Sequence, residues 1–274
     1  MFKFLISLKK LLNNKQFKKN PILILFRLIT LSLLDFFRIT KEIKINHHEF
    51  KFKFFYIPSL KIKSGGRGIF LFREKIEDLL EFGHQFIKKG DHCIDGGANQ
   101  GIFSLSFSSA VGLNGKVVAV EPFDYCVKSL KHNIQLNKFE NIHVCQEVLY
   151  NKPGLIKKLD FTNGVGGASI VRDFGYLNHF EVKTNTVDNI VKKFDLNLNF
   201  LKLDIEGAEY DALKGSIKSL AKNRPIICLE GDPNNYSKIS EFLKGFNYSP
   251  YYFENKKLEK LKGYKPLTNI FFLT

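Results

Sequence analysis

Cysteine is scarce in this sequence, with only four in 274 residues. They are scattered along the chain, and no two are close enough to suggest a clip of ligands for a structural zinc ion. They are Cys93, Cys126, Cys145 and Cys228. Scattered thiols are typical of a reducing compartment, so we expect ordinary core cysteines and a cytoplasmic protein.

Acidic residues are also few, because 27 Asp and Glu stand against 42 Lys and Arg, a formal net charge of +15 at pH 7. Such an excess favours contact with nucleic acid or with an anionic membrane. Lysine, asparagine, isoleucine and phenylalanine are abundant together, however, and biased genomic composition produces the same combination. The lysines are spread along the chain, and no Asn-Pro-Pro-Tyr motif for a flipped base is present, so we expect no nucleic-acid partner.

Two common nucleotide-binding motifs are missing from the glycine-rich stretch 91–122, which reads DHCIDGGANQGIFSLSFSSAVGLNGKVVAVEP. The stretch predicts a strand, a glycine turn, a helix and a second strand. The dinucleotide fingerprint G-x-G-x-x-G would need glycine where Ala98 stands, and no Gly-Lys-Ser/Thr follows the loop. Asp95, directly before the turn, would oppose a pyrophosphate but would suit a cationic ammonium and sulfonium. Glu121, after the second strand, could take both ribose hydroxyls. We therefore predict S-adenosylmethionine as the cofactor.

The first forty residues combine positive charge with an apolar run. Residues 1–20 carry six lysines and no acid, and residues 21–40 are strongly apolar with three charges among them. No small-residue cleavage site follows, so we do not expect a secretory signal. The internal charges argue against a bilayer crossing. We expect a helix packed on the rest of the chain; a helix lying on the inner face of a membrane through residues 1–40 is the alternative.

The remaining sequence predicts an N-terminal extension and a larger α/β domain. Residues 42–73 alternate in polarity, as in a β-rich lead-in, so we divide the chain into an extension at 1–74 and a catalytic domain at 75–274. Expected helices lie at 75–89 and 124–137, the second capped by Asp124, and expected strands at 116–120, 141–146, 200–203, 225–230 and 269–273. Residues 152–185, with NGVGGAS at 163–169, interrupt the alternation and suggest a substrate-recognition insertion.

Three further acidic positions follow predicted strands. Asp204 and Glu206 follow the strand at 200–203, so they are expected to face the same pocket as Asp95 and Glu121. Either one could remove a proton from a substrate hydroxyl, or the two could hold a divalent cation, although no His or Cys ligand set accompanies them. Glu147 could accept from an adenine amino group or be a solvated loop carboxylate. Glu209 and Asp211 are interpreted as first-turn acids that the helix dipole favours.

Several of these segments together resemble the FkbM-type methyltransferase family, across about residues 75–235. The similarity lies in IDGGANQGIFSL, VVAVEP, TVDNI, LKLDIEGAEYDALKG and IICLEG. It implies a class I methyltransferase fold, a Rossmann-like α/β arrangement whose seven-stranded, mostly parallel sheet has helices on both faces and an antiparallel last strand. It also implies O-methylation, often of sugars or secondary metabolites. Residues 1–60 lie outside the similarity and inherit nothing from it.

By the same resemblance, Asp95, Gly97, Asn99 and Gly101 would hold the methionine part of the cofactor, and Glu121 the ribose. The full set of expected cofactor-binding residues is Asp95, Gly96, Gly97, Ala98, Asn99, Gly101, Glu121, Pro122, Glu147 and Asp204. The expected acceptor is a small molecule or a glycan. A nucleic-acid methyltransferase and a non-catalytic module that binds membrane surfaces are the alternatives, and the intact acidic positions argue against the second.

Overall fold

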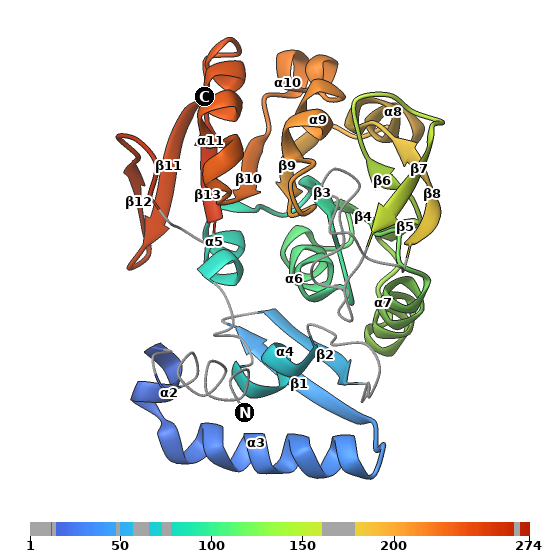
Figure 1. Cartoon of the computed structure of the whole chain (residues 1–274), viewed down its shortest axis with the longest axis vertical. Helices are drawn as coiled ribbons and strands as arrows, with labels where there is room; N and C mark the ends of the chain where they lie inside the picture. Colours follow the sequence, from blue (N-terminus) through green and yellow to red (C-terminus); the bar gives the residue numbers. More distant parts are fainter. Residues whose placement is uncertain are drawn as a thin grey trace.

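An eight-stranded sheet forms the centre of the molecule in the computed structural model, which describes residues 12, 15–47, 50–56, 66–72, 78–160, 179–265 and 269–274 (Figure 1). In spatial order the strands are β12 (Lys257–Lys260), β11 (Ser249–Glu254), β13 (Asn269–Leu273), β10 (Ile226–Glu230), β9 (Leu198–Leu203), β3 (His92–Gly96), β4 (Lys116–Val120) and β5 (Ile142–Cys145). The five strands from β10 to β5 are parallel, and β13 is antiparallel to β10. The predicted class I methyltransferase sheet is therefore confirmed, and β12 adds an eighth strand at its edge.

The sheet is covered on both faces because its strands are apolar on both faces. Neighbouring residues such as Cys93 and Ile94 point to opposite sides and belong to two separate buried clusters. One face carries α5 (Asp78–Phe86), α6 (Ile102–Val111) and α7 (Asp124–Asn137). The other carries α8 (Val187–Lys193), α9 (Glu209–Lys214), α10 (Ile217–Asn223) and α11 (Pro233–Lys244).

Helix α7 has the predicted bounds but a different beginning from the one expected. Asp124 is the first residue of the helix, whereas Phe123 occupies the capping position without a side-chain cap. The Asp124 carboxylate instead forms an ion pair with Lys128 one turn later, at 2.7 Å. Favourable interaction with the helix dipole and with Lys128 therefore replaces the expected cap.

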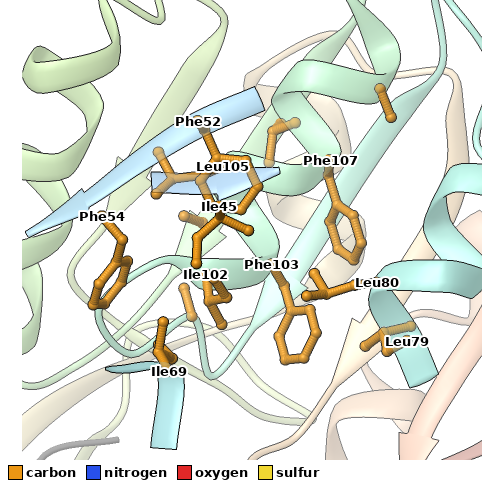
Figure 2. Close-up of a cluster of buried hydrophobic side chains, with 14 of the residues drawn as sticks. Ile45, Phe52, Phe54, Ile69, Leu79, Leu80, Ile102, Phe103, Leu105 and Phe107 are labelled. Carbon is orange, nitrogen blue, oxygen red and sulfur yellow. The ribbon is translucent and has the colours of Figure 1, made fainter. Parts of the chain in front are cut away.

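The N-terminal extension consists of α2 (Lys15–Lys19), α3 (Pro21–Phe36), β1 (Lys41–His47), β2 (Phe50–Tyr56) and α4 (Gly66–Phe72). The predicted alternation is present as an antiparallel hairpin of β1 and β2. The buried side chains of this hairpin, Ile43, Ile45, Phe52 and Phe54, pack in one cluster with α6, and Figure 2 shows Ile45 and Phe52 beside Leu105. The extension and the larger domain thus share one apolar core. The domain boundary at 74/75 stays a prediction, since residues 73–77 lie outside the described part.

Helix α3 packs on the rest of the extension through its inner face. Ile24, Leu31 and Leu34 are buried there. The Arg27 guanidinium donates to the Leu71 carbonyl of α4 at 2.8 Å, and Asp35 forms an ion pair with Arg67. Within the described ranges, no helix combines the length and the apolar character that a membrane crossing requires.

A small three-stranded sheet follows β5. Its order is β6 (Val148–Leu149), β8 (His179–Asn185) and β7 (Ile156–Asp160), with β7 and β8 antiparallel. These two strands lie within the predicted insertion at 152–185 and flank its NGVGGAS stretch. Residues 163–169 lie outside the described residues, so their part in substrate recognition stays a prediction.

Candidate active site

The loops that follow β3 and β9 meet at the carboxyl ends of the parallel strands. Gly97 has a φ of +74°, and a Cβ placed there would lie 1.9 Å from the carbonyl oxygen of Asp204. The Asp204 N–H donates to the Gly96 carbonyl at 3.1 Å. Only glycine permits this approach, because a side chain would separate the two loops. The structure therefore brings the glycine loop and the Asp204 segment together, as the strand order predicts.

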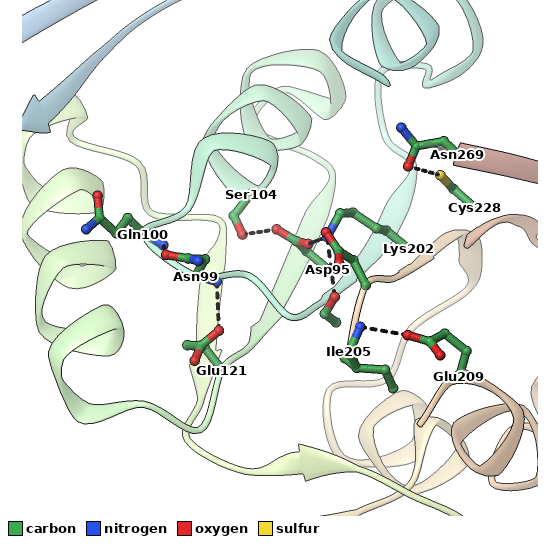
Figure 3. Close-up of polar contacts among 12 residues, drawn as sticks. Asp95, Asn99, Gln100, Ser104, Glu121, Lys202, Ile205, Glu209, Cys228 and Asn269 are labelled. Carbon is green, nitrogen blue, oxygen red and sulfur yellow. Dashed lines mark hydrogen bonds and ion pairs between the residues drawn. The ribbon is translucent and has the colours of Figure 1, made fainter. Parts of the chain in front are cut away.

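Asp95 lies at the end of β3 and is fully buried. Figure 3 shows its carboxylate between Ser104 and Lys202. The Ser104 hydroxyl donates to Oδ2 at 2.6 Å, and the Lys202 ammonium lies 3.2 Å from Oδ1. Both carboxylate oxygens therefore contact groups of the protein itself. Contact between Asp95 and a cofactor stays a prediction, and the cation that Asp95 faces in this structure is Lys202.

Lys202 is the site residue that sequence reasoning missed. It is buried in β9, directly opposite Asp95 in the parallel register, and its ammonium also lies 3.4 Å from Asp204 Oδ2 and 5.0 Å from the centre of the Phe103 ring. Burial alone would lower the pKa of Lys202, but the neighbouring Asp95 and Asp204 carboxylates outweigh it and raise that pKa. The available signal was a lysine inside the apolar run FLKL, since a charge on a central strand needs buried partners.

Glu121 ends β4 and joins two loops from a buried position. Its Oε2 accepts the Asn99 N–H at 2.8 Å, and its Oε1 accepts the Phe123 N–H at 3.0 Å. Burial raises the pKa of Glu121 to about 7, although the two backbone hydrogen bonds act in the opposite direction. Pro122 follows Glu121, half-buried. The carboxylate thus holds the glycine loop while keeping further lone pairs for other donors.

The backbone N–H groups of the glycine loop are all used within the protein. Those of Gly97 and Ala98 donate to the Val120 carbonyl, and that of Gly101 donates to Ala98. Asn99 donates to Glu121, and the Gln100 N–H donates to the Asn99 side chain. A loop arranged in this way offers no cradle of N–H groups to a phosphate.

The segment after β9 is held by Glu209 at the start of α9. The Glu209 Oε1 accepts the N–H groups of Ile205 and Gly207 at 3.0 and 3.2 Å. Burial is the largest influence on Glu209 and raises the pKa of its carboxyl. Glu206, between these donors, has a φ of +54°, a conformation that side chains other than Asn, Asp and Gly rarely adopt. Glu209 is thus a first-turn acid, as expected, and it also fixes the loop that presents Asp204 and Glu206.

Two predicted acids have partners away from this junction. The Glu147 Oε2 accepts from the Asn185 side chain at 2.6 Å, so its proposed contact with adenine stays a prediction. Asp211 forms an ion pair with Lys214 at 2.6 Å. Among the described residues, no group of three His, Cys, Asp or Glu side chains is arranged to hold a metal ion.

Comparison with known proteins identifies a family. The model of the methyltransferase FkbM domain matches residues 95–250. A search of curated proteins gave no significant match.

Many solved structures are similar to the chain, including the following three. Methyltransferase FkbM from Methylobacillus flagellatus is 13% identical, with a TM-score of 0.48, over 78% of this chain and 56% of its own. A putative rRNA methylase from Clostridium thermocellum is 14% identical, with a TM-score of 0.44, over 71% of this chain and 91% of its own. Fibrillarin from Aeropyrum pernix, with bound S-adenosyl-L-methionine, is 9% identical, with a TM-score of 0.44, over 69% and 68%. The chain thus spans little more than half the length of the first of these structures.

Proposed function

We propose that this chain, which belongs to the FkbM methyltransferase family, transfers a methyl group from S-adenosylmethionine to a hydroxyl of a sugar, glycan or secondary metabolite. The choice of cofactor is based on the glycine loop. Its five backbone N–H groups, from Gly97 to Gly101, all have hydrogen-bond partners inside the protein. A dinucleotide needs such N–H groups for its pyrophosphate, whereas S-adenosylmethionine has no phosphate.

The carboxylates of the site also fit this cofactor. Glu121 would hold the ribose, because a carboxylate accepts from both hydroxyls of a diol while its other lone pairs keep the Asn99 and Phe123 N–H groups. Lys202 carries one positive charge between Asp95 and Asp204, so this group of three has a net charge of −1. That negative charge favours the cationic methionine end of the cofactor.

S-adenosylmethionine, when bound, supplies a methyl group on a positively charged sulfur that leaves readily. The residues of the chain would hold the acceptor hydroxyl in line with this methyl and remove its proton as the new bond forms. The Asp204 carboxylate forms an ion pair with Lys202, so it already has a cationic partner within the protein. Glu206 occupies a strained backbone conformation in the same loop, and such strain is concentrated at functional sites. We therefore assign the proton transfer to Glu206 and the support of the site to Asp204.

Calorimetric titration with S-adenosylmethionine and separately with NAD tests the cofactor. Binding of the first alone, lost in Glu121→Ala, is the expected result. NAD binding would overturn the assignment, because the loop would then have to release N–H groups for a pyrophosphate. Glu206→Gln should bind the cofactor with unchanged affinity, and a variant that still turns over at the normal rate would remove Glu206 as the base.

Transfer of a labelled methyl group to a panel of sugars and hydroxylated small molecules tests the acceptor class. A methyl ether on oxygen withstands mild alkali, whereas a methyl ester releases methanol, so base-stable label on a sugar is expected. The net charge of +15 makes RNA the natural comparison. Label that accumulates on RNA and is released by ribonuclease, with none on the sugars, would reject the proposed acceptor class.

A further inference from the structure

Helix α3 is apolar on two opposite faces, and only one of them is buried in the protein. Its outer face carries six exposed apolar side chains at the helical spacing i, i+3, i+4, i+7, which we call the apolar stripe. These are Ile22, Leu25, Phe26, Ile29, Leu33 and Phe36. Ile22 is 82% exposed and Phe36 is 77% exposed. Figure 1 shows α3 along the lower edge of the molecule, on the side of the β1–β2 hairpin away from the central sheet.

The apolar stripe continues past the end of the helix. Phe37 and Ile39 are also exposed, and Leu23 adds to the first turn. A continuous apolar surface of this kind is uncommon on a protein that has no partner for it, and its usual occupants are another protein or a membrane. Single exposed apolar residues elsewhere, such as Leu113, lack such neighbours along a helix and need no explanation.

Positive charges flank the apolar stripe at both ends. Lys18 and Lys19 end α2 just before the helix, and Arg38 and Lys41 follow it, all of them exposed. The two acids nearby have cationic partners, because Asp35 pairs with Arg67 and Glu42 with Lys53. In sequence, residues 1–20 contain six lysines, Lys18 and Lys19 among them, and no acid. A second copy of the chain would bring two positive borders together, whereas an anionic lipid surface would attract them.

From this arrangement we infer that α3 docks on the surface of an anionic membrane, with the apolar stripe buried among the lipid headgroups and the flanking lysines on the phosphates. The geometry favours a helix parallel to the membrane. Sixteen residues extend about 24 Å, less than the hydrocarbon thickness of roughly 30 Å. The opposite face of the helix stays buried in the protein core through Ile24, Leu31 and Leu34. Only the apolar stripe is therefore available to the membrane interface. This inference is independent of the proposed methyl transfer.

Flotation of the full chain with vesicles tests the docking. The wild-type chain should float with vesicles of phosphatidylcholine and phosphatidylglycerol and remain behind with phosphatidylcholine alone. Ile22→Glu/Ile29→Glu should lower the partition coefficient by roughly tenfold or more, since it places two charges within the buried stripe. The matched control is Leu113→Glu/Ile217→Glu, which makes the same change of charge at two exposed apolar positions outside α3 and should float like the wild type.

A second measurement uses a fluorophore that does not disturb the charge. The sequence contains no tryptophan, so Phe26→Trp introduces a single reporter. Its emission should shift to shorter wavelength on addition of the anionic vesicles, whereas Leu113→Trp should not respond. Equal flotation of the two double variants, or an unshifted Phe26→Trp spectrum, would overturn the inference. So would a wild-type dimer in solution that the Ile22→Glu/Ile29→Glu change dissociates, because that result assigns the stripe to a second copy.

Discussion

Replacement of Lys202 by methionine should be among the most destabilising single changes in the central sheet. Methionine fills a similar volume but removes the charge that lies 3.2 Å from the buried Asp95 carboxylate. At an effective dielectric constant of 20, two charges at this distance attract each other by about 5 kcal/mol. The cost of removing both charges from water offsets most of this attraction, so the intact pair contributes little net stability.

Loss of one partner has a different effect, because it leaves the other charge buried without compensation. We therefore expect Lys202→Met to lower the free energy of unfolding by about 3–5 kcal/mol. Asp204 contributes less to this figure, since its side chain is 38% exposed and water screens it. In the double variant Lys202→Met/Asp95→Asn neither charge of this pair remains, and an asparagine oxygen still accepts from Ser104. Most of the lost stability should return.

Urea unfolding followed by circular dichroism measures these free energies, with Lys128→Met as the control. Lys128 lies 2.7 Å from Asp124, closer than Lys202 lies to Asp95, but the two side chains are 76% and 62% exposed. The control should therefore cost less than about 0.5 kcal/mol. A loss below 1 kcal/mol in Lys202→Met, or a double variant as unstable as the sum of its two single variants, would refute the argument that burial and not distance decides the effect.

Three further predictions concern the loops around this pair. Gly97→Ala should lower the free energy of unfolding by roughly 3 kcal/mol or more and abolish S-adenosylmethionine binding. Gly90→Ala, with a similar positive φ but open space around it, should lower the free energy of unfolding by about 1 kcal/mol in the same urea titration. Equal losses would mean that the Gly97 loop can move. Affinity for S-adenosylmethionine should rise about tenfold from pH 6 to pH 8 as Glu121, with its pKa near 7, ionises, and a flat calorimetric profile would exclude Glu121 as the ribose acceptor. Because this pKa is raised from 4.5 in the folded chain, the contribution of Glu121 to stability, about 3 kcal/mol, is present below pH 4.5 and lost as the pH rises through 7. Glu209→Ala should lower the free energy of unfolding by about 1–3 kcal/mol and reduce turnover, since the Ile205 and Gly207 N–H groups lose their acceptor. Normal turnover in a methyl-transfer assay would show that the loop keeps its shape without Glu209.

The sequence predicted helices and strands well where the apolar spacing within an element matches the surface on which that element packs. Helix α7 has the bounds that its apolar spacing predicts, and β13 covers the predicted residues Asn269–Leu273. Both elements place an apolar pattern of the right period against a sheet that is apolar on both faces. The eighth strand, β12, was not predicted, because its residues KLEK are mostly exposed and pair only with β11 at the edge of the sheet. A pattern of buried residues carries no information about such a strand.

The site was predicted less completely because a carboxylate's position along the chain does not say which groups it faces. The sequence places Asp95 at the end of a strand, and there a cationic ligand is a reasonable partner. The register adds a partner that the sequence pattern did not reveal, since β3 and β9 are parallel neighbours in which Asp95 and Lys202 are directly opposite. Opposite residues on adjacent strands point to the same face, so the Lys202 ammonium reaches the Asp95 carboxylate. A buried lysine beside two acids therefore indicates the register of the two strands, and the same reasoning can be applied to other sequences in which one charge interrupts an apolar central strand.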